Sequence, residues 1–237
     1  MERIHGELLK IGVDVSETTV RNVLRRANIR PWDGQSSENW RSSFKRHKYI
    51  WAIDFFTVHS APFKRMFVLV IMDIHSRRLI STRVTTHPTA EWTARVLNFE
   101  ITAVEAPPGI VHDRDPAFES AQFRDLLSLN QVKNMRCPSR TPIANAFVER
   151  LCLNISSGTL QRECTDHFLF FKNTQLQRAF KEYQTYYNRS RPHQGINQRI
   201  PDLPENRASR LQGSGENKVF SKAYLEGLHH DYFRADA

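Results

Sequence analysis

The stretch Tyr49-Ile-Trp-Ala-Ile-Asp54-Phe-Phe56 is an apolar run with a single acidic residue inside it. Its length and its aromatic and β-branched residues predict a strand over residues 49–58. A carboxylate in such a strand is costly to bury unless it is paired or binds a cation. Asp54 is therefore either part of a structural ion pair or the first residue of a functional site.

The segments that follow complete a mixed sheet. Met66-Phe-Val-Leu-Val-Ile-Met72 is apolar on both faces, which predicts an interior strand covered by helices. Further strands are predicted over 78–84, 110–112 and 132–136, with helices over 88–103, 119–129, from about 143, and 173–188. Three antiparallel strands followed by alternating helices and short parallel strands predict an α/β fold with helices flanking the sheet.

Two more acidic residues stand in distinctive contexts. Asp113 directly follows the short strand Gly109-Ile-Val-His112, and Glu149 ends the run Asn145-Ala-Phe-Val-Glu149 on a predicted helix. Asp54 and Asp113 are separated by 58 residues, and Asp113 and Glu149 by 35. Three converging carboxylates could bind divalent metal and catalyse phosphoryl transfer. Oxygen-only ligation suits Mg²⁺ or Mn²⁺ better than zinc.

These motifs resemble the catalytic core of bacterial insertion-sequence transposases and integrases, the DDE group with a ribonuclease H-like fold. The resemblance rests on Trp51-Ala-Ile-Asp-Phe-Phe56, on His112-Asp-Arg-Asp-Pro-Ala-Phe118, and on Asn145 with Glu149-Arg150. It continues through Arg162-Glu-Cys-Thr-Asp-His167 and Arg191-Pro-His-Gln194, and it extends over nearly the whole chain. The 35-residue gap is the spacing that this family commonly shows.

The resemblance implies an active site with two Mg²⁺ or Mn²⁺ ions. Asp54 would bridge the ions, Asp113 would bind one of them, and Glu149 the other. The implied reaction is cleavage of DNA ends followed by strand transfer, with water and then a DNA 3′-hydroxyl as nucleophiles. The implied partners are double-stranded DNA and further copies of the chain assembled on it.

Neighbouring polar residues compete for these roles. Asp115 is predicted to cap a turn, and Asp73 to form a local ion pair before a tight turn. His112 is either an outer partner of the metal ligands or a packed strand histidine. Asn145 is expected to cap or position the helix that carries Glu149.

The charge of the chain favours an anionic partner. It contains 34 basic and 25 acidic residues, for a net charge of +9 and an isoelectric point near 9.7. Nucleic acid is the leading candidate, although a basic soluble protein remains the alternative. The candidate DNA contacts are Thr18, Thr19, Arg21, Arg25, Arg26, Lys45, Arg46, Arg150, Arg162 and Arg191.

Residues 1–30 are predicted to form two helices, the second capped by Ser16 and basic on its outer faces. They resemble part of a helix-turn-helix, with 16–28 placed to enter a major groove; a hairpin that only packs on the core is the alternative. Because similar proteins carry more sequence upstream, we expect the chain to begin inside this domain. A basic linker over 31–48, a catalytic core over 49–200 and a C-terminal tail over 201–237 complete the predicted organisation.

Three cysteines without paired spacing argue against a disulfide framework or structural zinc. No apolar run reaches membrane-spanning length, so the expected location is the bacterial cytoplasm, at the nucleoid.

Residues 151–158 depart from the family pattern and end in Ser156-Ser-Gly158, which is poor helix material. A catalytically degenerate DNA-binding protein is therefore kept as an alternative. A ribonuclease H-like nuclease without strand transfer is a further alternative, against which the helix-turn-helix-like start argues.

Overall fold

The computed structural model describes residues 2–27, 49–136, 160–203 and 219–234. The chain divides into two compact units. The core unit comprises residues 40–184, and the helix–hairpin unit comprises residues 1–39 and 185–237. The boundary falls within one long helix, α8 (Asn173–Arg189).

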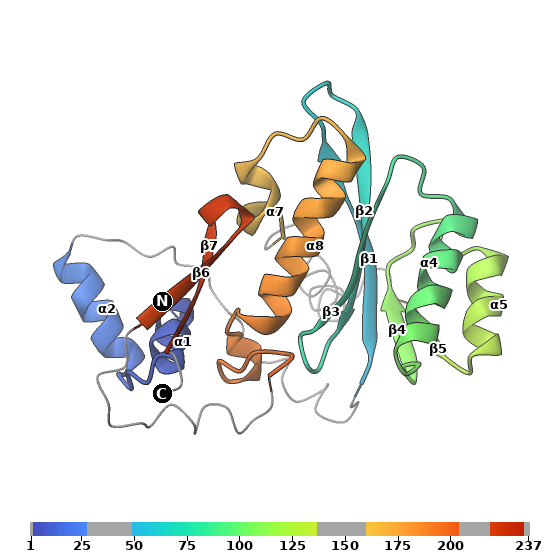
Figure 1. Cartoon of the computed structure of the whole chain (residues 1–237). Coiled ribbons are helices and arrows are strands. Elements are labelled where there is room, and N and C mark those ends of the chain that lie inside the picture. The colour runs from blue at the N-terminus through green and yellow to red at the C-terminus, as the bar shows by residue number, and fades with distance from the viewer. Residues whose placement is uncertain (1, 28–48, 137–159, 204–218, 235–237) are drawn as a thin grey trace. The chain divides into compact units, whose positions relative to one another are not determined.

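A five-stranded mixed sheet forms the centre of the core unit (Figure 1). The strands lie in the order β3-β2-β1-β4-β5. The pairs β1–β2 and β2–β3 are antiparallel, and β1–β4 and β4–β5 are parallel. Their bounds are β1 (Trp51–His59), β2 (Arg65–Asp73), β3 (Leu79–Thr85), β4 (Gly109–His112) and β5 (Lys133–Arg136). This is the predicted ribonuclease H-like arrangement, with all five predicted strands within one or two residues of their expected bounds.

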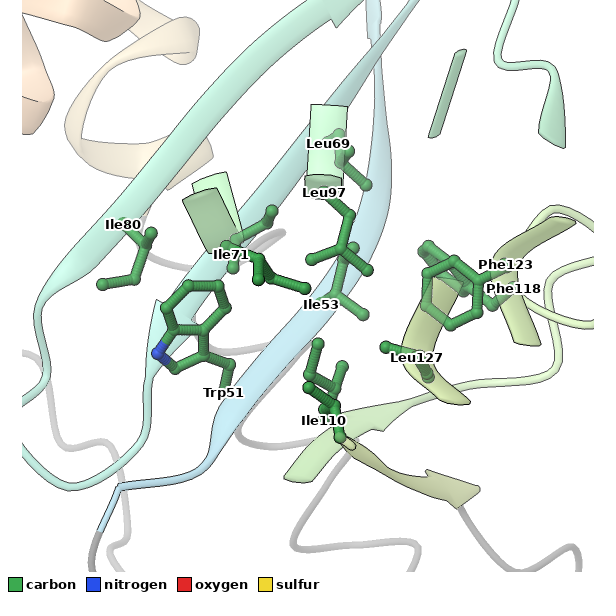
Figure 2. Packing of buried hydrophobic residues seen from close by; sticks show 12 residues of the cluster. Trp51, Ile53, Leu69, Ile71, Ile80, Leu97, Ile110, Phe118, Phe123 and Leu127 are labelled. Carbon is green, nitrogen blue, oxygen red and sulfur yellow. The ribbon is translucent and has the colours of Figure 1, made fainter. Parts of the chain in front are cut away.

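One face of the sheet packs against helices α4 (Ala90–Ala103) and α5 (Ala121–Leu129). Both helices begin at a side-chain cap, in which Thr89 and Ser120 accept hydrogen bonds from backbone N–H groups one turn ahead. Figure 2 shows the resulting core, in which Ile53 of β1 lies beside Leu97 of α4 and Trp51 belongs to the same cluster. Alternate residues of β1 point to this face, as the period of a strand requires.

Helix α8 packs against the core unit's sheet as well, and in Figure 1 it lies on the side away from α4 and α5. Its ring of Phe180 meets Phe56 of β1 at a centroid distance of 5.7 Å. The Gln184 side chain donates to the carbonyls of Leu79 and Ile80 at 3.0 and 2.9 Å, which satisfies two backbone acceptors of β3. Because both faces of β2 are thereby covered, its continuous apolar sequence is explained, as predicted.

The helix–hairpin unit contains the two predicted N-terminal helices. Helix α1 (Glu2–Lys10) ends before Gly12, whose φ of 76° suits glycine, and α2 (Glu17–Arg26) begins at the predicted cap Ser16. The Ser16 hydroxyl accepts from the backbone N–H of Thr19 at 3.1 Å. Val20 of α2 is buried, whereas Val23, predicted to share its apolar stripe, is 57% exposed.

A β-hairpin occupies part of the segment that was expected to be a tail. Strands β6 (Val219–Tyr224) and β7 (His229–Arg234) pair antiparallel. The ring of Tyr186 in α8 stacks on His229 at 4.6 Å, and Lys10 of α1 forms an ion pair with Asp231 at 2.6 Å. The predicted flexible tail is therefore wrong for residues 219–222, because contacts with distant parts of the chain stabilise a hairpin there.

Cys164, one turn after the start of α7 (Leu160–Glu163), is fully buried. Burial raises the pKa of its thiol to about 12, and the nearby charge of Glu182 adds to the shift. Since the folded pKa lies above the unfolded value of 9.0, the stability that the protonated thiol contributes is present below pH 9 and is lost as the pH rises towards 12.

We expect Cys164 to be unreactive towards thiol reagents in the native protein. Cys137 and Cys152 lie outside the described residues, so both are first changed to serine. Labelling with a chromogenic disulfide at pH 8 should then be slower than in denaturant by roughly a thousandfold, because the thiolate is the reactive form. Rapid labelling in native buffer would contradict this burial.

Candidate active site

The register of the parallel pair β1–β4 brings two of the predicted carboxylates together. Ile53 lies opposite His112 in this pairing. Asp54 directly follows Ile53, and Asp113 directly follows His112. The two aspartates therefore lie at the same level along the two paired strands. Neighbouring strands are ~4.8 Å apart. The two aspartates, with 58 residues between them in sequence, therefore occupy neighbouring backbone positions at the carboxyl end of β4.

Asp54 is fixed within the longest part of the sheet. It is half-buried, and its backbone is paired with Val70 of β2. Its Oδ1 accepts a hydrogen bond from the Phe55 N–H at 2.8 Å. By the alternation of the strand it shares a face with Ala52 and Phe56, as predicted. A carboxylate on such a rigid platform can hold a cation without moving.

Asp113 stands at the first turn after β4 and is exposed. Its Oδ1 accepts from the N–H of Asp115 at 2.9 Å, and the Asp115 carboxylate accepts from Ala117 at 2.9 Å. Asp115 therefore caps a turn, the role predicted for it. These bonds hold the loop that carries Asp113 in one conformation.

Asp73 has a different environment from these two residues. It is 4% exposed, and its carboxylate accepts from the His75 N–H at 2.9 Å and from the Ser76 hydroxyl at 2.5 Å. The local ion pair predicted for Asp73 is wrong in kind, because hydrogen bonds to an N–H and a hydroxyl close the turn between β2 and β3 instead. Asp73 serves the fold of this turn.

His112 links the sheet to the loop of Asp113. Its ring is fully buried and lies against Phe118 and Phe123, with centroid distances of 5.5 and 5.4 Å. Nδ1 donates to the backbone carbonyl of Asp113 at 2.6 Å, and Nε2 lies 2.6 Å from Oδ1 of Asn134. His112 is therefore a packed strand histidine, one of the two predicted alternatives, and it also bonds to the backbone of Asp113; its role as an outer partner of a metal ligand stays a prediction.

Asn134 was not identified from the sequence. It lies on β5 and reaches His112 only because β5 pairs with β4 in parallel, 22 residues further along the chain. A single asparagine in a short strand carries no signal of such a role. The contact between Asn134 and His112 becomes visible only once the pairing of β4 with β5 is known.

The donor set fits a hard divalent cation as far as the structure describes it. Asp54 and Asp113, at adjacent backbone positions of β1 and the loop after β4, offer the carboxylate oxygens that Mg²⁺ and Mn²⁺ prefer as ligands. Within the described ranges, no group of three His, Cys, Asp or Glu residues is arranged to hold a metal ion. The third predicted ligand, Glu149, lies outside those ranges, as do Asn145 and the segment 151–158.

We expect His112→Phe to retain the fold but to weaken binding of Mg²⁺ at the candidate site. Phenylalanine preserves the ring packing and removes the bond to the Asp113 carbonyl. Loss of such an outer partner costs roughly 10–100-fold in metal affinity or activity. The measurement is the Mg²⁺ concentration that produces half of the metal-induced rise in melting temperature, which should increase.

His112→Asn is the complementary variant, because its side-chain N–H can still reach that carbonyl while the ring packing is lost. It should lower the melting temperature and leave the Mg²⁺ requirement near that of the parent. An unchanged Mg²⁺ requirement in His112→Phe would show that His112 acts through packing alone.

The candidate DNA contacts on α2 are all turned to solvent. These exposed residues are Thr18, Thr19, Arg21, Arg25 and Arg26. Arg162 on α7 is also exposed, whereas the Arg191 guanidinium lies over the Tyr187 ring at 5.3 Å and 2.9 Å from His193 Nδ1. Lys45, Arg46 and Arg150 lie outside the described residues.

Comparison with protein families gives two matches, both to an integrase core domain. One model matches residues 45–142 and a second matches residues 130–201. A comparison with curated proteins finds no match. No helix within the described residues is long and apolar enough to cross a bilayer.

Among solved structures, the catalytic core of HTLV-2 integrase with magnesium, in a dimeric form, is 19% identical and has a TM-score of 0.49. The match covers 63% of this chain and 92% of that one. The catalytic core of BIV integrase is 17% identical over 65% of this chain and 90% of its own, with a TM-score of 0.45.

Proposed function

Because the chain belongs to the integrase core domain family, we propose that it is a metal-dependent DNA transposase or integrase that cleaves DNA ends and joins them to target DNA. The observation that supports this most is the pairing of Ile53 with His112, which makes Asp54 and Asp113 neighbours. Two aspartates at the carboxyl end of a strand, in a chain with net charge +9, suit a phosphodiester substrate.

The proposed site consists of three carboxylates and a histidine that supports one of them. Asp54 on the sheet, Asp113 on the loop after β4, and Glu149 would together hold the two cations. When bound, Mg²⁺ or Mn²⁺ ions activate the attacking oxygen and stabilise the leaving oxygen. His112 holds the loop in place through its bond to the backbone carbonyl of Asp113. The Asp113 carboxylate is therefore already positioned before a metal ion binds.

The proposed partners are double-stranded DNA and other copies of this chain assembled on it. Helix α2 supplies three exposed arginines that can face phosphates. Its serine-capped start and basic last turn suit the second helix of a helix-turn-helix, placed in a major groove. These contacts would position the DNA, while the carboxylates act on it.

The test is a strand-transfer assay on the element's own DNA ends, with Mg²⁺ or Mn²⁺ as the cofactor. The proposal predicts metal-dependent nicking at the 3′ ends and joined products that contain target DNA. Nicking without joining would favour a ribonuclease H-like nuclease. Binding to the ends without nicking in either metal would favour a degenerate DNA-binding protein, which the segment 151–158 suggests as the second candidate.

A further inference from the structure

Three large apolar side chains are turned to solvent at one end of the core unit. Phe63, in the turn between β1 and β2, is 89% exposed, and Leu169 and Phe171, just before α8, are 79% and 60% exposed. The Ala61 N–H donates to the Phe170 carbonyl at 2.7 Å, which ties the two segments together. In Figure 1 both lie at the same end of the sheet. We call these three side chains the apolar tip.

The backbone holds these side chains outward. Phe63 has a φ of 58°, a left-handed conformation that glycine or asparagine adopts far more readily than an aromatic residue. The turn around it is closed by a bond from the Phe63 N–H to the Ser60 carbonyl at 2.8 Å. Such local strain persists where the surrounding structure enforces it, and it often marks a functional site.

The segment before α8 is anchored in a similar way. Phe170 is 6% exposed and its ring lies 6.1 Å from that of Phe168, so this residue fixes the segment to the protein. Leu169 and Phe171, on either side of it, then project outward. Exposed apolar residues of this size in one place indicate a binding surface.

The rim of the apolar tip is basic. Lys64, Arg65 and Lys172 are exposed, and among the described residues no carboxylate lies within ion-pair distance of these three side chains. Two such surfaces would repel each other, which disfavours docking of a second copy through this face. The complementary partner is anionic and also offers flat apolar surfaces.

We propose that the apolar tip binds DNA at unpaired or unstacked bases, with its aromatic rings against the bases and the basic rim on the flanking phosphates. Aromatic side chains stack on bases of any sequence, and apolar wedges inserted between base pairs open the duplex. This inference rests on the proposed function for the identity of the partner. It adds a second role, recognition of distorted DNA beside the reacting phosphate.

The position of the tip suits that role. From Asp54, strand β1 continues to His59, a span of roughly 17 Å at 3.3 Å per residue, and the turn with Phe63 follows directly. DNA advances about 3.4 Å per nucleotide along each strand. A duplex held at Asp54 and passing the tip would thus meet it about five nucleotides from the reacting phosphate.

The test compares binding of two 30-base-pair duplexes that differ only in three central mismatched pairs, at low salt and without divalent metal. The parent is expected to bind the mismatched duplex about tenfold more tightly. A Phe63→Asn/Phe171→Ser variant should lose this preference and keep its affinity for the paired duplex. Asparagine tolerates the backbone of Phe63, so the variant should fold, which circular dichroism and the melting temperature would verify.

Phe99→Ser is the matched control, because Phe99 is a phenylalanine of α4 that is 59% exposed. It should leave the preference unchanged. If the double variant still binds the mismatched duplex more tightly than the paired one, the inference is overturned. It is also overturned if the double variant changes from dimer to monomer while this difference in affinity stays the same, because the apolar tip would then be a protein contact. The binding test does not require catalytic activity. A parent protein that cleaves no DNA but prefers the mismatched duplex would therefore contradict the proposed reaction and still support base binding by the apolar tip.

Discussion

Replacing Asp113 with asparagine is expected to abolish DNA cleavage while DNA binding stays nearly intact. Asparagine preserves the size of the side chain and can still accept the bond from the Asp115 N–H, so the loop should keep its conformation. It removes the charge that holds a hard cation. A metal-based contribution of about 4 kcal/mol to the transition state corresponds to a loss of roughly 1000-fold in rate.

The matched control is Asp125→Asn on α5, where an exposed aspartate of the same unit loses its charge away from the site. It should cleave at the rate of the parent. Rates are measured as nicking of labelled element ends, and binding by gel shift in Ca²⁺. Cleavage by Asp113→Asn at more than a tenth of the parent rate would exclude this residue as a metal ligand.

DNA affinity is expected to fall steeply with salt. Each phosphate neutralised by a lysine or arginine releases counterions, so the slope of log affinity against log salt is about −0.9 per contact. With six or more contacts, affinity for duplex DNA should drop by roughly 1000-fold between 50 and 200 mM salt. Fluorescence anisotropy over this range gives the slope directly.

Replacing Arg21, Arg25 and Arg26 together with alanine should make that slope shallower by about 2.7. All three are exposed on α2, so the change should not disturb packing. Arg95→Ala is the control, because this arginine is already paired with Glu91 at 2.6 Å on the surface of α4. An unchanged slope in the triple variant would assign α2 to packing, which was the alternative for these helices.

The main sheet was predictable from the sequence because its strands are long and chemically uniform. β2 is apolar on both faces and can only be an interior strand, and the alternation in β1 assigned Asp54 to one face. The short strand before Asp113 was found because Pro107-Pro-Gly109 separates it from α4. The register that sets Ile53 of β1 opposite His112 of β4 was not predicted, because it depends on how the two strands pair.

Features that depend on contacts between distant residues were not predictable. The β6–β7 hairpin begins directly after the polar stretch 202–218, and its support comes from Tyr186 and from Lys10, which lies 221 residues from Asp231 in sequence. The bond between His112 and Asn134 requires the pairing of β4 with β5. The left-handed φ of Phe63 has no signal in sequence, because such positions usually carry glycine.

The central claim is that Asp54, Asp113 and Glu149 bind the same divalent ions, and cleavage of the protein backbone by bound iron tests it most directly. Fe²⁺ replaces Mg²⁺ at oxygen sites, and with ascorbate and peroxide it cuts the chain next to where it is bound. The account predicts cuts near residues 54, 113 and 149 that excess Mg²⁺ suppresses and that Asp113→Asn removes. Cuts confined to other segments, or cuts near 54 and 113 without one near 149, would contradict it.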